Sequence, residues 1–227
     1  MPTQGKYEVD TLPTSAGDLQ ITFLGHGSLL FTFNGKQIYI DPFGEVADYS
    51  KLPKADVVLI THEHFDHLDL KALAKIQTSQ TVVVLTQLCA KQVKGGIVMR
   101  NGDQRTVNGV QVEAAPAYNI VHKRQDGKPF HPQGDGNGYI LTFGDQRVYV
   151  AGDTENIPEM KGLKNIVCAF LPMNLPYTMT PEMVAEAAKA FRPRILYPYH
   201  FGDTDTAKLQ QLLGQESGIE IRIRRLA

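Results

Sequence analysis

The stretch Thr61-His62-Glu63-His64-Phe65-Asp66-His67 decides the fold and the chemistry that this sequence predicts. It places three imidazoles and a carboxylate within six residues, directly after the apolar run of residues 57–60 (VVLI). Four aliphatic residues in a row predict a buried strand, so the cluster lies where that strand ends. Because side chains alternate along an extended chain, His62 and His64 share one side and Glu63 faces the other.

These side chains are of the types that bind metal ions. Neutral imidazoles with a carboxylate oxygen are ligands for zinc, iron(II) or manganese rather than for calcium or magnesium. The alternative interpretation is a polar turn that happens to be rich in histidine. Four ligand-type side chains at one strand end favour the metal site.

The motif His62-x-His64-x-Asp66-His67 resembles the signature of the metallo-β-lactamase fold superfamily of metal-dependent hydrolases. The resemblance runs from about Leu19 to the C-terminus. Two further stretches, residues 21–28 (ITFLGHGS) and 39–43 (YIDPF), are similar to the ascorbate-phosphate-lactonase-like branch of that superfamily.

Turn signals and helix caps indicate an α/β chain made of two similar halves. The pairs Asn34-Gly35, Asn108-Gly109 and Gly144-Asp145 separate strand-like runs and predict two-residue hairpins. Helices are predicted after the N-cap residues Asp69 and Thr180. Two halves with hairpins and covering helices fit a four-layer αββα sandwich, with the site along one edge. The predicted helices are residues 70–76, 87–93, 181–191 and 204–213, and the other predicted strands include residues 81–85, 166–171 and 194–199.

Polar side chains at other strand ends would complete a site for two metals. A dinuclear site needs about six or seven ligands, with the metals ~3.5–4 Å apart. Considered by itself, Asp153 could equally be a metal ligand or a turn residue. Considered by itself, His200 would be interpreted as a core histidine. The resemblance implies that the first metal is bound by His62, His64 and a histidine of the loop before Gly138, the second by Asp66, His67 and His200, with Asp153 bridging them. The predicted cofactors are thus two divalent ions, with zinc preferred and manganese or iron as alternatives.

The spacing of the motifs does not show whether the loop histidine that binds the first metal is His131 or His122. We predict His131. It precedes a glycine-containing turn and the strand beginning at Gly138, as in the family, and Pro132 holds it in extended conformation. His122 is followed by two cations, Lys123 and Arg124, which disfavour a nearby metal ion. We expect His122 to be a surface residue of a mobile loop.

Several other polar residues near the ligands are candidates for substrate binding or for supporting the metal ligands. His26 either lines the cleft or caps a turn, and we do not expect it to bind metal. Asp41 is either a turn residue before proline or an acid that steadies the metal-binding loop. We expect Glu63 to point away from the site, whereas Asp66 orients the attacking water while binding metal. The full candidate list is His26, Asp41, Tyr118, Asn119, Asn174, Tyr177 and Tyr199.

The predicted activity is hydrolysis by a metal-bound hydroxide, with a small lactone, ester or phosphodiester as substrate. No Gly-x-Ser-x-Gly motif suggests a serine hydrolase. The alternatives are an iron-dependent redox enzyme on the same scaffold and a metal-binding module without catalysis.

Composition is that of an ordinary globular protein. The chain has 227 residues, 42% apolar and 21% charged, which predicts one domain over residues 1–227, with residues 1–18 as a polar arm or first strand. A net charge of −1 without basic runs argues against a nucleic-acid partner. No apolar run is long enough for a membrane helix.

The two cysteines, Cys89 and Cys168, lie in apolar surroundings and are predicted to be buried reduced thiols. A cytoplasmic protein is expected. The alternative is an exported protein from which a signal has been removed.

Overall fold

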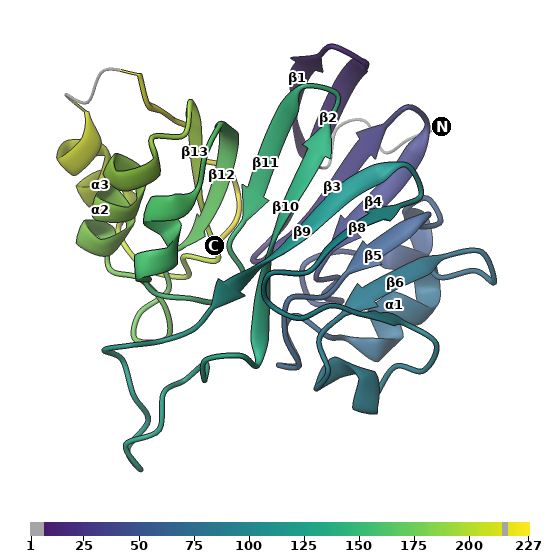
Figure 1. Ribbon diagram of the computed structural model, residues 1–227, viewed down its shortest axis with the longest axis horizontal. Helices are drawn as coiled ribbons and strands as arrows, with labels where there is room; N and C mark the ends of the chain where they lie inside the picture. The colour runs from purple at the N-terminus through teal and green to yellow at the C-terminus, as the bar shows by residue number, and fades with distance from the viewer. Residues whose placement is uncertain (1–6, 215–217) are drawn as a thin grey trace.

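A computed structural model describes residues 7–214 and 218–227, which form two mixed β-sheets packed against each other (Figure 1). Within these residues, each half of the chain builds one seven-stranded sheet. The first sheet follows the sequence order β1 (Glu8–Thr14), β2 (Gly17–Gly25), β3 (Ser28–Phe33), β4 (Lys36–Ile40), β5 (Val57–Leu59), β6 (Val82–Leu85) and β7 (Ile97–Val98). The second also keeps neighbours in sequence adjacent: β8 (Gln104–Val107), β9 (Val110–Ala117), β10 (Gly136–Phe143), β11 (Gln146–Val150), β12 (Ile166–Pro172), β13 (Ile195–Tyr199) and β14 (Glu220–Ile221).

Both sheets combine antiparallel hairpins with a parallel part. Strands β1 to β4 are antiparallel and β4 to β7 are parallel. Likewise, β8 to β11 are antiparallel and β11 to β14 are parallel. Parallel strands have their carboxyl ends at the same edge of a sheet, which is where ligand sites form in α/β proteins.

The three predicted hairpin turns are confirmed. Asn34 and Gly35 have φ angles of 49° and 77° between β3 and β4, and Asn108 and Gly109 have 47° and 84° between β8 and β9. Asn and Gly tolerate this left-handed conformation, which two-residue turns between twisted strands require. Gly144 turns in the same way between β10 and β11.

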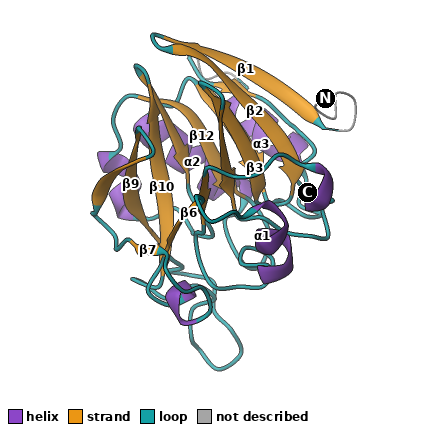
Figure 2. Ribbon diagram, turned by 90° about the vertical axis from the view of Figure 1, so that its right-hand side faces the viewer, coloured by secondary structure: helices purple, strands orange, loops and turns teal. Residues whose placement is uncertain are grey.

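The helices make the structure four layers thick, as predicted. Helices α2 (Pro181–Phe191) and α3 (Thr206–Leu213) cover the second sheet, and α1 (Leu70–Ile76) covers the first, with the strands between them (Figure 1). A core of aliphatic and aromatic side chains, including Phe31, Phe143 and Phe170, fills the space between the sheets. The long loop between β9 and β10 extends from the end opposite the β1–β2 hairpin (Figure 2).

Two predicted helices differ from the observed ones. Residues 87–93 contain only a single 3₁₀ turn, Cys89–Lys91. Helix α3 begins at Thr206 rather than Thr204, because the Asp205 carboxylate accepts the amide of Ala207 at 2.8 Å and caps the helix there. Both cysteines are free and buried, as predicted.

Strand β1 takes up part of the polar N-terminal segment and contacts the C-terminal segment. Asp10 accepts hydrogen bonds from Arg222 (3.2 Å), Arg224 (2.8 Å) and the Tyr197 hydroxyl. The backbone N–H of Arg225 donates to Glu8 at 2.7 Å. Residues 1–6 lie outside the described part, and the single domain over residues 1–227 stays a prediction.

In the described parts of the chain, no helix has the length and apolar character needed to cross a bilayer.

Candidate metal centre

The predicted ligands lie together where several strands end. Residues 61–67 follow β5, Asp153 follows β11, and His200 directly follows β13. His131 reaches the same place from the loop between β9 and β10. The parallel parts of both sheets thus deliver their polar loops to one shared site.

The first group of ligand atoms consists of His62, His64 and His131, whose ligand atoms all lie within 4.8 Å of one another. His62 Nε2 is 3.0 Å from His64 Nδ1, so the two side chains that alternation placed on one side do converge. His131 Nε2 is 3.2 Å from Asp153 Oδ2. The structure brings His131 into this group and not His122.

The second group consists of His26, Asp66, His67 and His200, again within 4.8 Å of one another. Asp66 Oδ2 lies 3.8 Å from His67 Nε2 and 3.6 Å from His200 Nε2. His26 Nε2 is closer still to Asp66, at 3.0 Å. We expected His26 not to bind metal, yet its ring nitrogen belongs to this group by position.

Asp153 lies between the two groups, in the place expected of a bridging ligand. Its carboxylate oxygens are 3.5 Å from His67 Nε2, 3.7 Å from His200 Nε2 and 3.9 Å from His62 Nε2. His62, His67 and Asp153 also form a potential ligand group of their own.

The donor atoms fit metal ions rather than a closed hydrogen-bond network. Among the described residues, His67 Nε2, His131 Nε2, His200 Nε2 and Asp153 Oδ1 are buried without a hydrogen-bond partner. Each unsatisfied buried polar atom costs about 1–3 kcal/mol, so four at one point indicate that something else binds them. Nitrogen and carboxylate donors in this number match zinc, iron or manganese.

The electrostatics set different protonation states for the ligand candidates. Burial opposes protonation of His67, but the carboxylates of Asp153 and Asp41 raise its pKa to about 9, so a metal ion bound by this ring would displace a proton. Burial lowers the pKa of His62 and of His64, so both rings are neutral near pH 7. Burial opposes ionisation of Asp66, but the nearby His200 ring, 3.6 Å away, and the hydrogen bond with His26 hold the pKa of its carboxyl well below the usual range. Asp66 is therefore an ionised carboxylate at the site.

Asp41 stabilises the loop that carries the metal-ligand candidates through hydrogen bonds. Its fully buried carboxylate accepts the Thr61 amide at 2.7 Å and the Thr61 hydroxyl at 2.6 Å. It also lies 2.8 Å from His67 Nδ1, which directs His67 Nε2 toward the site. Thr61 was not among the predicted residues, although it stands beside the motif.

Three site residues have left-handed backbone conformations. The φ angles are 53° for His26, 44° for Asp41 and 47° for His200. Residues other than glycine rarely adopt this region, and each such residue costs about 1–3 kcal/mol. Strain of this kind concentrates at functional sites, where surrounding contacts enforce it.

The loop carrying His131 is held by Asn119 and by a residue that sequence reasoning missed, Glu155. Asn119 Oδ1 is 2.6 Å from His131 Nδ1. Glu155 is buried and accepts the Asn119 side-chain amide at 3.1 Å. No local pattern could reveal this pair, because its members are far apart in the sequence.

The predicted tyrosines and Asn174 have different surroundings. The Tyr118 hydroxyl donates to Glu159 at 3.0 Å, and its ring packs in the core beneath α2. Asn174 closes a turn by accepting the amides of Tyr177 and Thr178 through its carbonyl. Tyr177 is 45% exposed, whereas Tyr199 is buried and burial raises the pKa of its hydroxyl well above the ordinary value.

His122 and Glu63 lie outside the three potential ligand groups formed by the described residues. His122 is partly exposed, and its Nδ1 is 2.8 Å from a Glu155 carboxylate oxygen. Glu63 is one of the residues that line the small pocket formed by the first ligand group itself.

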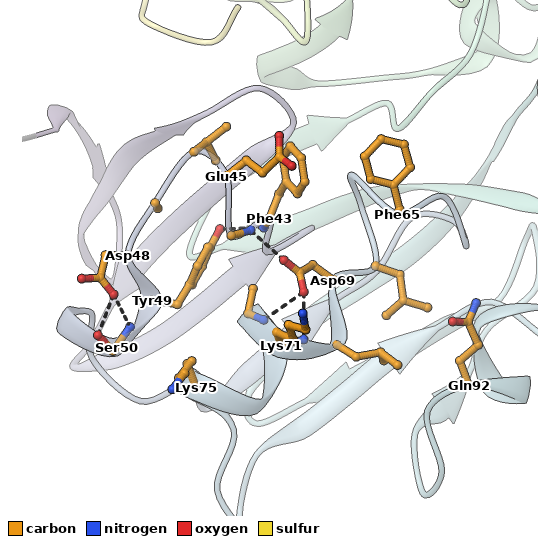
Figure 3. A pocket seen from close by; sticks show the side chains of 16 residues that line it. Phe43, Glu45, Asp48, Tyr49, Ser50, Phe65, Asp69, Lys71, Lys75 and Gln92 are labelled. Atoms are coloured by element: carbon orange, nitrogen blue, oxygen red, sulfur yellow. Dashed lines mark hydrogen bonds between the residues drawn. The ribbon is translucent and has the colours of Figure 1, made fainter.

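The open space near the site lies mainly to one side of the ligands. The pocket lined by His62, His64, His131 and Asp153 has a volume of only about 10 Å³. A groove of about 790 Å³ lies between residues 43–50 and α1, with Phe43 and Phe65 along it (Figure 3). Gly44 is required there, since a Cβ atom would lie 2.8 Å from Asp69 Oδ2, which accepts the Gly44 amide at 2.9 Å.

Large apolar side chains are exposed on the loops around the ligand candidates. Of the eight large hydrophobic side chains exposed in the described residues, five lie in loops that carry metal-ligand candidates or contact them. We call these five the apolar rim: Phe65, Ile120, Val121, Leu175 and Tyr177. Exposed large apolar side chains near a site are candidates for contact with a bound molecule.

Comparison with known proteins agrees with the geometry. A family model described as a beta-lactamase superfamily domain matches residues 20–200. The chain belongs to the metallo-β-lactamase superfamily. Within this superfamily it is similar to a UPF0173 metal-dependent hydrolase of Koribacter versatilis, with 35% identity over 200 residues, covering 81% of this chain and 84% of the relative.

Two solved structures share the architecture. The crystal structure of a protein named as a metal-dependent hydrolase from Parabacteroides distasonis superposes with a TM-score of 0.93 and 49% identity, covering 97% of this chain and all of that one (100%). Igni18, a metallo hydrolase from Ignicoccus hospitalis, gives a TM-score of 0.73 at 24% identity, covering 92% of this chain and 96% of that one, and shows the fold alone. The narrower ascorbate-phosphate-lactonase-like branch stays a prediction.

Proposed function

We propose that this protein uses two divalent metal ions to hydrolyse a small lactone, ester or phosphodiester. The observation that carries the proposal is the pair of ligand groups joined by Asp153, with unpartnered ring nitrogens facing one another. His62, His64 and His131 would hold the first ion, and Asp66, His67 and His200 the second, with zinc as the preferred metal.

When bound, such ions lower the pKa of a coordinated water to about 7 and polarise a carbonyl or phosphoryl oxygen. Asp66 is ionised and partly exposed, so its carboxylate would orient the attacking water by accepting a hydrogen bond from it. His26, which lies 3.0 Å from Asp66, limits the directions that this carboxylate can take. Asp41 holds His67 by its Nδ1 atom, so that the His67 Nε2 atom faces the metal site beside Asp66 and His26.

The surroundings of the site support a small substrate with an apolar part. The ligand pocket itself has little volume, so a substrate would enter with its reacting group first and leave the remainder at the mouth. There the apolar rim supplies the contact surface. Tyr177, whose ring lies 5.1 Å from that of Phe130, is placed to stack against such a group.

A substrate panel tests the activity. Protein loaded with zinc or manganese would be assayed against lactones, phosphodiesters and β-lactams, with Asp153→Asn as the matched inactive control. We expect turnover of at least one lactone or phosphodiester and loss of that turnover in the control. Two bound metals with no turnover of any substrate would contradict the proposal.

Metal analysis separates hydrolysis from the redox alternative. Protein purified without added metal is expected to be colourless and to contain zinc. About two equivalents of iron, with visible absorbance, would instead indicate an iron-dependent redox enzyme on this scaffold.

A further inference from the structure

Glu155 is a buried carboxylate whose contacts all lie in the loop before His131. Only 1% of the residue is exposed. Its oxygens accept three consecutive backbone amides, those of Ile120 (2.7 Å), Val121 (2.7 Å) and His122 (2.6 Å). A carboxylate that binds successive amides in this way fixes the course of the backbone, because charge-assisted hydrogen bonds are the stronger ones.

The same carboxylate sets the orientation of the Asn119 amide. Asn119 Nδ2 donates to Glu155 at 3.1 Å and to the carbonyl of Tyr177 at 2.9 Å. Both partners are acceptors, so the NH₂ group must face them and Oδ1 must face the opposite way. Exchanging the two amide atoms would set an oxygen against both acceptors.

Asn119 Oδ1 in turn determines the state of His131. It accepts the His131 backbone amide at 2.9 Å and lies 2.6 Å from His131 Nδ1. An acceptor at this distance keeps the proton on Nδ1 and leaves the lone pair on Nε2. That Nε2 is buried without a hydrogen-bond partner in the described residues and points at Asp153, 3.2 Å away.

Glu155 is itself anchored to the segment that carries Asp153. Its backbone amide donates to the carbonyl of Tyr118 at 2.9 Å, and the Thr154 hydroxyl contacts the same carbonyl at 3.1 Å. Hydrogen bonds therefore join the loop that carries His131 to the segment that carries Asp153. Glu155 is the charged residue among the groups that make these hydrogen bonds.

We propose that Glu155 is a positioning residue that acts through Asn119 to orient His131 for the first metal. The inference rests on the proposed two-metal site and concerns metal affinity rather than turnover. Loss of partners behind a metal ligand typically weakens metal binding by 10–100-fold. Glu155→Gln should weaken the first metal site by about that factor and leave the second unchanged, because within the described residues the Glu155 carboxylate contacts only residues 119–122 and neither His67 nor His200.

The test is a competition titration of each metal site with a zinc chelator, in the full-length protein. Glu155→Gln and Asn119→Leu should each weaken one site selectively. In a His131→Ala background, Glu155→Gln should have no further effect on metal affinity, since the ligand that it positions is gone. Glu159→Gln is the matched control, because Glu159 is bonded to the neighbouring Tyr118 but has no contact with Asn119 or His131 among the described residues.

Each contrary result has a clear meaning. A lowered Tm for Glu155→Gln with both metal affinities unchanged would show a purely structural role and overturn the inference, as would equal weakening of both sites. Additive effects of Glu155→Gln and His131→Ala would also overturn it. If Glu155→Gln does not fold, Asn119→Leu alone decides the question by the same selective loss. Wild-type protein with two metals bound but no hydrolysis would refute the proposed function and leave this inference standing.

Discussion

The backbone N–H of His200 donates to the carbonyl oxygen of His26 at 3.2 Å, which joins the end of β13 in one sheet to the end of β2 in the other. Both residues have left-handed φ angles, and their ring centroids are 3.7 Å apart. Two strained residues from different sheets thus hold each other in place at the second ligand group.

Replacement of His26 by alanine is expected to weaken the second metal site by about 10–100-fold, because Asp66 loses the partner that fixes its carboxylate. The measurement is metal affinity by competition titration. Asn34→Ala is the matched control, since Asn34 has a similar φ of 49° but lies in a hairpin turn. It should cost about 1 kcal/mol of stability with normal metal binding. Equal metal affinities in His26→Ala and wild type would contradict the prediction.

The two loop histidines are expected to behave differently. His131→Ala should lose about one equivalent of metal and nearly all activity, because it removes a ligand of the first group. His122→Ala should retain both metals and change substrate affinity at most. Metal content by elemental analysis, with activity measured in parallel, separates the two. The reverse pattern of metal loss would show that the ligand is assigned to the wrong histidine.

Asp41→Asn should affect both stability and metal binding. The variant removes a charge that is fully buried between Thr61 and His67, at a cost of about 3 kcal/mol. We also expect at least a tenfold loss in metal affinity. Denaturant unfolding of metal-free protein measures the first effect and chelator competition the second. Asp56→Asn, which removes the charge of a carboxylate that accepts the Gln37 amide outside the ligand groups, should leave metal affinity unchanged.

Asp10 should contribute stability that depends on pH. Burial opposes its ionisation, but hydrogen bonds from Tyr197 and Arg224 hold its pKa below the ordinary 3.8. A carboxyl with a lowered folded-state pKa stabilises the protein above its unfolded-state pKa, and this contribution is lost as the pH falls through the folded-state pKa. Asp10→Asn should therefore reduce stability at pH 7 by about 2 kcal/mol. In an acid titration followed by circular dichroism, the variant should unfold at a higher pH than wild type. Coincident acid transitions would refute the contribution.

The apolar rim should determine the preference for the uncharged part of the substrate. Phe65 is 74% exposed beside two ligands, so Phe65→Ser should raise KM for substrates with longer apolar groups and leave kcat nearly unchanged. A homologous series of esters or lactones measures this, with the loss growing with chain length at roughly 0.8 kcal/mol per buried CH₂ at most. Leu212→Ser, on the exposed face of α3, is the control. A KM that is independent of chain length in both wild type and variant would exclude a role for Phe65.

The sequence predicted the fold well because its signals are local. Two-residue hairpins are predicted by the pairs Asn34-Gly35 and Asn108-Gly109 alone. Helix starts are predicted by the capping side chains of Asp69 and Thr180. The ligand motif is also local, since it lies within one loop after β5. The error at residues 87–93 is local too, because Leu88, which precedes the 3₁₀ turn Cys89–Lys91, makes no capping hydrogen bond of the kind that Asp69 makes before α1.

The residues that position the metal ligands are much harder to predict from the sequence. Glu155 acts on a loop more than thirty residues earlier, through backbone amides that any sequence would provide. The closeness of His26 to Asp66 depends on the pairing of the two sheets and on a left-handed φ, neither of which a run of residues reveals. Only the packed structure brings such partners together.

The division of the chain into one sheet per half has a consequence for how the protein matures during synthesis. The first half supplies His62, His64, Asp66 and His67, while His131, Asp153 and His200 come from the second. A nascent chain on the ribosome therefore has an incomplete set of ligands until β13 and His200, which follows it, have been synthesised. Metal capture would then be a late event that clamps the two halves together, and chelators should loosen the junction between the sheets before either sheet melts.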